Sequence, residues 1–290
     1  MLWVLAPIGA AALAAIARGR HARSIERGYS ERYGHNAQGI AAGAEPFTLE
    51  GMSGRALLLL HGSGDSPQSL AYLAARLHSA GYTVHVPLLP GHGRSPRAFS
   101  RATAADYHEA ARAAFARLKE EHEWVGLIGQ SMGGALATRL AAEVAGARVL
   151  VLLAPYLIAP AEVRRVARLS WLLRIVAPYV QGGGEASIHD PAAAAASRGY
   201  GSFSGGALKA LVATADAGFK SLARLSIPTI VINSDQDNRI PRATAEAALS
   251  AMPESTEQHW VTGCGHVISV DYCKARVADL VLAFVARYAD

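Results

Sequence analysis

Short apolar segments alternate with longer segments of helical periodicity from Phe47 to the end of the chain. The apolar segments are typical of strands buried on both faces of a sheet, and the segments between them repeat apolar residues every three or four positions, as amphipathic helices do. The predicted strands span residues 55–60, 83–87, 125–129, 148–154, 229–234 and 258–261. The predicted helices span residues 69–80, 103–122, 132–144, 242–251 and 275–289. This alternation indicates an α/β fold with helices on both faces of a mostly parallel central sheet.

The stretch from 156 to 225 does not follow this alternation. It holds glycine-rich segments and a tract of alanines at 192–196, with helical segments between them. We therefore expect a small helical cap, inserted between the two halves of one core. The predicted division is an N-terminal apolar segment at 1–24, the first part of the core at 25–155, the cap at 156–225 and the second part of the core at 226–290.

The chain begins with an uncharged apolar run from Leu2 to Ala17, and arginines follow at 18, 20 and 23. As a helix these 16 residues span about 24 Å, whereas a bilayer core is about 30 Å thick. We expect a membrane anchor or a helix in the membrane interface, so that residues 2–17 associate the protein with a membrane. The arginines would then hold the rest of the chain in the cytoplasm. Two alternatives stay open: a signal peptide that leaves a secreted or periplasmic protein, and a helix packed on the domain.

A second basic segment lies in the predicted cap. Arg164, Arg165 and Arg168 lie on one side of a predicted helix, and Trp171 and Leu172 follow them. We expect a solvated helix face, with a membrane-facing or anion-binding surface as the alternative.

Composition narrows the classes of protein. Apolar residues make up 51% of the chain and charged residues 18%, which excludes a disordered chain and allows a sizeable core. The net charge of +5 comes partly from arginines near the N-terminus, so no nucleic-acid surface is indicated. Cys264 and Cys273 are nine positions apart, without a C-x-x-C pattern or the spacing of metal ligands. The sequence therefore predicts neither a disulfide framework nor a zinc site.

The segment from Gly129 to Gly133 fits the G-x-S-x-G pattern, with Ser131 at its centre. An apolar strand is predicted directly before it and an alanine-rich helix directly after it. A serine on such a tight turn stands exposed above the sheet, and the small residues at 129 and 133 let the turn approach its neighbours. The helix N-terminus favours negative charge beside the hydroxyl. The pattern predicts that Ser131 is a nucleophile.

A serine hydroxyl needs a base, and the base needs a group that orients it. His266 lies in a loop between the last predicted strand and the last predicted helix, at the end of the sheet where the serine is expected. His259 is the competing base, but it falls inside a predicted strand. For the acid, Asp237 and Asp235 both follow the strand 229–234, and we favour Asp237, with Asp235 as a turn residue.

These motifs together resemble the α/β-hydrolase family, and within it bacterial carboxylesterases and monoacylglycerol lipases. The resemblance runs from about residue 55 to residue 288 and rests on five motifs in order. They are His61-Gly62-Ser63-Gly64, Pro90-Gly91-His92-Gly93-Arg94-Ser95, Gly129 to Gly134, Asp237-Asn238-Arg239-Ile240-Pro241 and Gly265-His266-Val267-Ile268. The resemblance implies the α/β-hydrolase fold, a triad of Ser131, Asp237 and His266, and an oxyanion hole formed by the backbone N–H groups of Ser63 and Met132. It implies no cofactor and no metal. His61 and His92 are expected to brace loops through hydrogen bonds.

The expected activity is that of a serine hydrolase that cleaves carboxylic esters through an acyl-enzyme intermediate. The expected substrate is a small-molecule ester, and the apolar cap favours one that contains an acyl chain. The same triad could serve a thioesterase, a carbon–carbon hydrolase or an aminopeptidase, although an aminopeptidase needs acidic residues for the substrate amine. A non-catalytic, membrane-tethered binding protein that keeps this fold is the alternative from another class.

Overall fold

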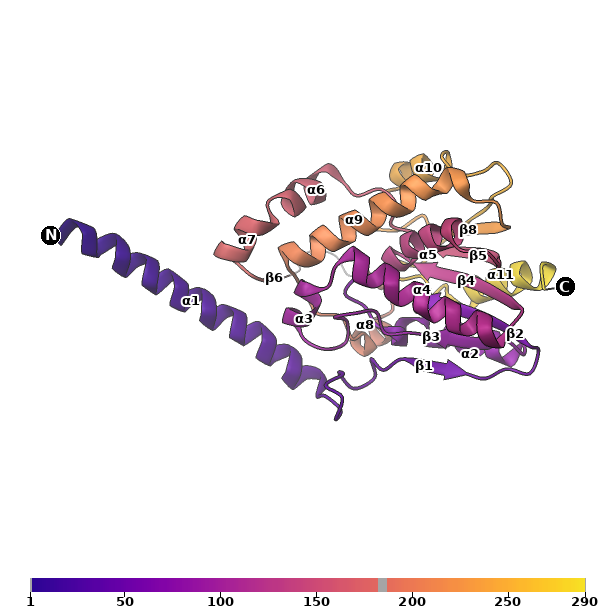
Figure 1. Ribbon diagram of the computed structural model, residues 1–290, viewed down its shortest axis with the longest axis horizontal. Coiled ribbons are helices and arrows are strands. Elements are labelled where there is room, and N and C mark those ends of the chain that lie inside the picture. The colour runs from indigo at the N-terminus through magenta and orange to yellow at the C-terminus, as the bar shows by residue number, and fades with distance from the viewer. Residues whose placement is uncertain (1, 182–186, 290) are drawn as a thin grey trace.

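A seven-stranded sheet forms the centre of the protein, with strand order β1-β3-β2-β4-β5-β8-β9 (Figure 1). The computed structural model describes residues 2–181 and 187–289. The strands are β1 (Phe47–Leu49), β2 (Arg55–Leu60), β3 (Thr83–Val86), β4 (Trp124–Gln130), β5 (Ala147–Leu153), β8 (Thr229–Ser234) and β9 (Glu257–Val261). Strand β1 pairs antiparallel with β3, and all other pairs in this sheet are parallel. The predicted α/β fold with a mostly parallel sheet is confirmed.

Helices cover both faces of the sheet, and two clusters of buried side chains result. Along β2, Ala56, Leu58 and Leu60 face one cluster, whereas Leu57 and Leu59 face the other. The first cluster packs against α4 (Ala104–Glu121), α5 (Met132–Glu143) and α10 (Arg242–Leu249). The second packs against α2 (Ala71–Ser79) and α11 (Lys274–Arg287). This burial on both faces explains why the strands are apolar at successive positions instead of alternate ones.

The segment between β5 and β8 forms short helices and a two-stranded antiparallel ribbon. Its elements are α6 (Ala161–Arg168), α7 (Ser170–Val176), β6 (Val180–Gln181), α8 (Pro191–Ala196), β7 (Ser202–Phe203), α9 (Gly205–Ser221) and η2 (Leu222–Arg224). Helix α9 packs closely on the core: a Cβ at Gly218 would lie 2.6 Å from the carbonyl oxygen of Ala135 in α5. The remaining short helices are η1 (Pro67–Leu70), before α2, and α3 (Pro96–Arg101), after β3.

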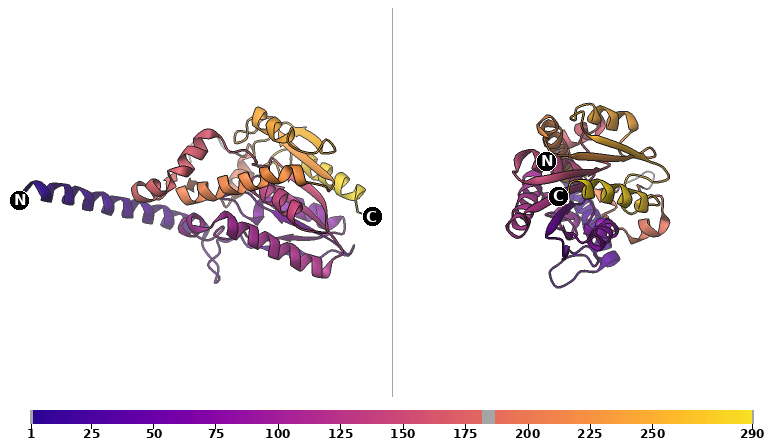
Figure 2. Two further views of the ribbon diagram at one scale, coloured as in Figure 1. Left: turned by 45° about the horizontal axis from the view of Figure 1, so that its top comes forward. Right: turned by 90° about the vertical axis from the view of Figure 1, so that its right-hand side faces the viewer.

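The N-terminal segment is one helix, α1 (Leu2–Tyr33), that projects away from the domain (Figures 1 and 2). The helix continues well past the apolar run, and Tyr29 and Tyr33 near its end contact the domain. The Tyr29 ring stacks on Tyr200, and the Tyr33 hydroxyl donates to the carbonyl oxygens of Ser197 and Gly199. Among the described residues, no helix is both long and apolar enough to cross a membrane.

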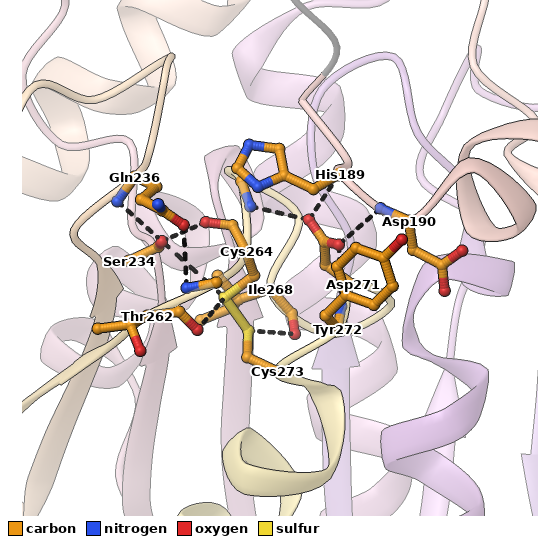
Figure 3. Close-up of a disulfide and its surroundings, with 12 residues drawn as sticks. His189, Asp190, Ser234, Gln236, Thr262, Cys264, Ile268, Asp271, Tyr272 and Cys273 are labelled. Atoms are coloured by element: carbon orange, nitrogen blue, oxygen red, sulfur yellow. Dashed lines mark hydrogen bonds between the residues drawn. A yellow bond between two sulfur atoms is a disulfide. The ribbon is translucent and has the colours of Figure 1, made fainter.

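The two cysteines form a disulfide (Figure 3), so the prediction of no disulfide from their spacing was wrong. The chain between Cys264 and Cys273 folds back on itself, and this brings their Cα atoms to 5.8 Å, a normal separation for a disulfide. Both cysteines are buried. Sequence spacing could not show this approach, because it depends on the turn at residues 267–271, where the N–H of Val270 bonds to the carbonyl oxygen of Val267.

Candidate active site

Ser131 lies on a sharp turn between β4 and α5, with a backbone φ of 54° and ψ of −119°. Non-glycine residues rarely adopt a positive φ, so the surrounding chain must hold this conformation in place. The glycines on both sides make the turn possible: a Cβ at Gly129 would lie 2.2 Å from the carbonyl oxygen of Gly133, and one at Gly133 would lie 2.1 Å from that of Leu60. The N–H of Ser131 also donates to the carbonyl oxygen of Leu153 in β5, at 2.9 Å.

Three loops at the carboxyl ends of the strands bring Ser131, His266 and Asp237 together. The distance from Ser131 Oγ to His266 Nε2 is 2.8 Å, and the distance from His266 Nδ1 to Asp237 Oδ2 is 2.7 Å. The side chains of His266 and Asp237 are only 9% and 4% exposed, so water competes little for these bonds. This geometry fits a neutral imidazole that donates from Nδ1 to the carboxylate and accepts the serine proton at Nε2.

The surroundings of Asp237 stabilise its ionised form. Burial alone would raise the pKa of this carboxyl group, but the bond and charge of His266 and the N–H groups of Ile240 and Arg239 outweigh it and lower the pKa. The competing candidates lie elsewhere. Asp235 is exposed, and His259 Nε2 pairs with Glu257 Oε1 at 2.6 Å within β9.

The loop after β2 lies against the nucleophile. A Cβ at Gly62 would lie 3.3 Å from the Cβ of Ser131, and Ser63 lines the cavity beside it. Met132 is the first residue of α5, where backbone N–H groups are not used within the helix. The two predicted oxyanion-hole residues therefore flank the space in front of Ser131.

His61 and His92 brace this loop, as the sequence led us to expect. The N–H of Gly64 donates to His92 Nε2, and the N–H of Leu89 donates to His61 Nε2, each at 3.1 Å. Both side chains are fully buried. Burial lowers the pKa of His61 to about 4, and burial with the neighbouring His61 lowers that of His92. Both rings are therefore neutral near pH 7 and can accept hydrogen bonds.

A cavity of about 490 Å³ opens in front of Ser131 and His266. Its wall is largely aromatic and aliphatic, with residues contributed by α3, α8, β7 and α9. Examples are Phe99, Tyr156, Tyr200, Phe203, Leu208 and Leu211. Besides His266, the wall holds the ionisable side chains of Asp65 and Arg239. Burial raises the pKa of Asp65 to about 6, although hydrogen bonds from Ser69 and Ser66 and the charge of His266 act in the opposite direction.

Sequence reasoning missed Asp65 and Arg239 as lining residues and gave no role to Asp271. Asp65 directly follows the predicted oxyanion loop, and Arg239 lies two positions after Asp237, so proximity to the motifs was an available signal for both. No local pattern marks Asp271. Within residues 2–181 and 187–289, no cluster of three or more His, Cys, Asp or Glu side chains is arranged to hold a metal ion.

A strained serine elbow, a histidine and an aspartate in hydrogen-bonded series at the carboxyl edge of a parallel sheet define a serine hydrolase of the α/β-hydrolase fold. The family model described as Hydrolase_4, serine aminopeptidase S33, matches residues 53–272. The chain belongs to this family.

Comparison with characterised relatives gives the same class. The chain is 27% identical over 262 residues to a thermostable monoacylglycerol lipase of Bacillus sp. (strain H-257), covering 86% of this chain and 97% of the relative. It is 25% identical over 245 residues to a carboxylesterase of Bacillus subtilis (strain 168), covering 84% and 96%. The resemblance drawn from the motifs is confirmed.

Solved structures agree on the fold. A structure from a study of LipS and LipT, two metagenome-derived lipolytic enzymes, has a TM-score of 0.78 at 26% identity and covers 86% of this chain and 99% of that one. The monoacylglycerol lipase of Paleococcus ferrophilus has a TM-score of 0.70 at 18% identity, with 83% and 98% covered.

Proposed function

We propose that the protein hydrolyses carboxylic esters of acyl chains, with a monoacylglycerol-like ester as the substrate class. The observation that carries the proposal is the continuous series of hydrogen bonds from Ser131 Oγ through His266 to Asp237, at 2.8 and 2.7 Å. The largely apolar cavity in front of Ser131 suits an acyl chain. The lipases and esterases among the relatives support the same class.

In the proposed reaction, Ser131 Oγ attacks the ester carbonyl carbon while His266 Nε2 takes the hydroxyl proton. The backbone N–H groups of Ser63 and Met132 stabilise the oxyanion that forms. His266 then gives its proton to the alcohol that leaves, and an acyl-enzyme remains on Ser131. Water, activated by His266, releases the fatty acid. Asp237 holds the imidazole in the required tautomer throughout.

The test combines a fluorophosphonate label with p-nitrophenyl esters of increasing chain length. We expect the label on Ser131 of the wild-type protein, and a loss of ester turnover of about 10⁴-fold or more in Ser131→Ala. Activity should increase from acetate towards longer chains, because longer chains bury more apolar surface in the cavity. Labelling or turnover that persists in a folded Ser131→Ala protein would falsify the assignment.

A serine aminopeptidase is the second candidate, since the family description carries that activity and Asp65 offers one carboxylate in the cavity wall. Aminoacyl p-nitroanilides, acyl-CoA thioesters and monoacylglycerols should be compared at equal enzyme concentration. We expect the monoacylglycerol to be the best substrate. An anilide preference that Asp65→Asn removes would favour the aminopeptidase instead, and a thioester preference would favour a thioesterase.

We propose that the protein also associates with a membrane, through α1 and α7 together. Leu169, Trp171, Leu172 and Ile175, in and beside α7, are between 40% and 63% exposed. Arg18 in α1 donates to the carbonyl oxygen of Ile175, so α7 lies beside α1 where the apolar run 2–17 ends. The two neighbouring helices carry exposed arginines: Arg20, Arg23 and Arg27 in α1, and Arg165 and Arg168 in α6, which directly precedes α7. Apolar side chains bordered by arginines suit a bilayer with anionic headgroups.

Vesicle co-sedimentation tests the membrane proposal. The full chain should bind vesicles of phosphatidylglycerol more strongly than vesicles of phosphatidylcholine, and Trp171→Ser should weaken binding to both. Met52→Ser is the matched control, since Met52 is 99% exposed but lies in the loop between β1 and β2, at the other end of the molecule (Figure 1). Equal loss in both variants, or no binding by the wild type, contradicts the proposal.

For the compartment, the arginines after residue 17 and the disulfide favour opposite sides of a membrane. A disulfide is stable outside the cytoplasm, whereas cytoplasmic thiols stay reduced. We propose that the catalytic domain lies on the oxidising side of the membrane, because the Cys264–Cys273 disulfide persists there and would be reduced in the cytoplasm. Alkaline phosphatase fused to the C-terminus in a bacterial host should be active; a fluorescent GFP fusion with inactive phosphatase would place the domain in the cytoplasm.

A further inference from the structure

The loop of residues 263–273, termed here the histidine loop, is held by contacts that lie outside the triad. The peptide N–H groups on both sides of His266 have fixed acceptors. The N–H of Gly265 donates to Asp271 Oδ2 at 2.8 Å, and the N–H of Val267 donates to the carbonyl oxygen of Ser187 at 3.1 Å. The backbone of His266 is therefore restrained on both sides.

Asp271 is the centre of this network (Figure 3). Its side chain is fully buried and accepts four backbone N–H groups at 2.8 to 2.9 Å: those of Gly265 and His189 at Oδ2, and those of Asp190 and Tyr272 at Oδ1. Burial alone would raise the pKa of this carboxyl group, but the four donors outweigh it and lower the pKa. A buried carboxylate thus binds the histidine loop to the cap segment at residues 189–190.

The disulfide restrains the same loop from its two ends. Cys264 lies two residues before His266, and Cys273 directly precedes α11. The carbonyl oxygen of Cys264 also accepts from the hydroxyl of Ser234 at the end of β8. Since Asp237 follows the same strand, the disulfide also lies at the junction between the loops of the base and the acid.

We propose that Asp271 and the Cys264–Cys273 disulfide act together as a positioning device for His266, termed here the clamp. The inference rests on the proposed triad chemistry, in which His266 Nε2 must stay within hydrogen-bond reach of Ser131 Oγ. Displacing a catalytic group by about 1 Å can cost about 100-fold in rate. The clamp therefore acts on the rate of proton transfer, and Asp271 is a positioning residue that does not touch the substrate.

The clamp has a second consequence for the cavity. The Asp190 side chain caps α8 by accepting from the N–H groups of Ala192 and Ala193, and α8 contributes Ala193 and Ala194 to the cavity wall. Through the N–H of Asp190, the Asp271 carboxylate sets the position of α8 and of His266 at once. A change at Asp271 should affect both the rate and the fit of long acyl chains, whereas a change of the Asp190 side chain should affect mainly the fit.

The first test compares Asp271→Asn with Asp190→Ala in the full-length protein. The amide keeps the shape of the carboxyl group, but its NH₂ faces two of the four N–H donors. Active sites are counted with a fluorophosphonate, so kcat refers to folded, competent protein only. For p-nitrophenyl acetate, whose acyl group is too short to need the α8 wall, we expect Asp271→Asn to lower kcat about 10- to 100-fold with KM within about twofold. Asp190→Ala should raise KM for long-chain esters more strongly than it changes this kcat, because it removes the cap of α8 and leaves the Asp271 carboxylate in place.

The second test addresses the disulfide and does not depend on the folding of Asp271→Asn. Dithiothreitol gives two electrons and two protons to the disulfide, which becomes two thiols while the reagent closes to its cyclic disulfide. We expect about a tenfold lower kcat for the reduced protein and for the double variant Cys264→Ala/Cys273→Ala, and recovery when the wild type is reoxidised. The triple variant Cys264→Ala/Cys273→Ala/Asp271→Asn is compared with the separate variants where all of them fold. Its fold-decrease in kcat should be smaller than the product of the two separate fold-decreases, because both changes act on one loop.

The outcomes separate this inference from the proposed function. If the wild type hydrolyses esters and is labelled at Ser131, but the Asp271→Asn protein and the double cysteine variant keep the wild-type kcat per active site, the clamp is wrong and the triad stands. If the wild type itself lacks ester turnover, the proposed function is wrong. A lower yield of folded protein with unchanged kcat would show that the clamp only stabilises the fold, and would also overturn it.

Discussion

The loops that carry Ser131 and His266 reach the same edge of the sheet but are held in different ways. The serine elbow, residues 129–133, is fixed by the close approach of backbones: the missing Cβ atoms of Gly129 and Gly133 leave room for the carbonyl oxygens of Gly133 and Leu60, and Ser131 has a positive φ. The histidine loop is fixed by polar and covalent bonds: those of the Asp271 carboxylate and the Cys264–Cys273 disulfide, which belong to the loop itself, and that of the Ser234 hydroxyl. The nucleophile is thus positioned by a short motif that the sequence shows, whereas the base depends on side-chain bonds that no local pattern marks.

Substitutions in the two loops should therefore have different effects. Changes in the elbow should act mainly on folding, because the close approach of backbones leaves no room to adjust. Changes around the histidine loop should act mainly on rate, because the loop can move while the core stays packed. Four substitutions, at Asp237, Gly133, His61 and Ser234, test this contrast.

The largest effect is expected at the acid that orients the base. Asp237→Asn should lower kcat about 10⁴-fold, equivalent to about 5.4 kcal/mol of activation free energy, because the amide favours the wrong imidazole tautomer. The exposed Asp235 is the matched control, and Asp235→Asn should stay within about twofold. Steady-state kinetics with one p-nitrophenyl ester checks both, and the reverse ranking would show that the orienting acid is Asp235.

On the elbow side, Gly133→Ala should destabilise the protein by about 3 kcal/mol or more, since the new Cβ would lie 2.1 Å from the carbonyl oxygen of Leu60. Gly28→Ala in α1 is the control, because a Cβ at Gly28 would have no atom within 4 Å and alanine favours a helix. Urea unfolding measures both free energies. A Gly133→Ala protein of wild-type stability would mean that the elbow tolerates movement as the histidine loop does.

The histidines under the oxyanion loop predict a pH dependence of stability. The pKa of His61 is about 4 in the folded protein, because of burial, and about 6.5 when unfolded. Below about pH 6.5 the unfolded chain therefore binds a proton that the folded protein does not, and stability falls as the pH falls towards 4. The contribution of this one group approaches about 1.4 kcal/mol per pH unit.

His61→Gln isolates this contribution. Between about pH 6 and pH 4.5 the free energy of unfolding of His61→Gln should fall less steeply than that of the wild type. Taking the difference between the two proteins removes the effect of Asp65, whose raised pKa acts in the opposite direction. Equal slopes in both proteins would show that His61 does not titrate on unfolding in this range.

The smallest effect is expected at the junction between the acid and base loops. Ser234→Ala removes the hydroxyl that donates to the carbonyl oxygen of Cys264 and should cost about 1 kcal/mol of stability. If the position of the histidine loop depends on these contacts, as we infer, kcat should also fall a few-fold. Ser250→Ala, at an exposed hydroxyl on the surface, is the control and should change neither quantity.

Much of the fold followed from local patterns. The predicted strands at 55–60 and 229–234 match β2 and β8 residue for residue, and the other predicted strands of the sheet differ from the observed ones by one residue at one or both ends. This agreement has a physical basis, since strands buried on both faces must be apolar throughout. Ser131, Asp237 and His266 could also be selected, because chain order and strand ends place them at one edge.

Local patterns in the sequence are sufficient for the alternation of strands and helices and for the elbow, because each depends on residues close together in the chain. The candidate triad follows from chain order and from the positions of the strand ends. Tertiary contacts, in contrast, are needed to explain the antiparallel placement of β1, the continuation of α1 to Tyr33, the disulfide and the four bonds to Asp271. Each of these depends on which groups come within contact distance after the chain has folded. A carboxylate such as Asp271 has no local signature, since its four donors are supplied by the cap and by the turn of its own loop.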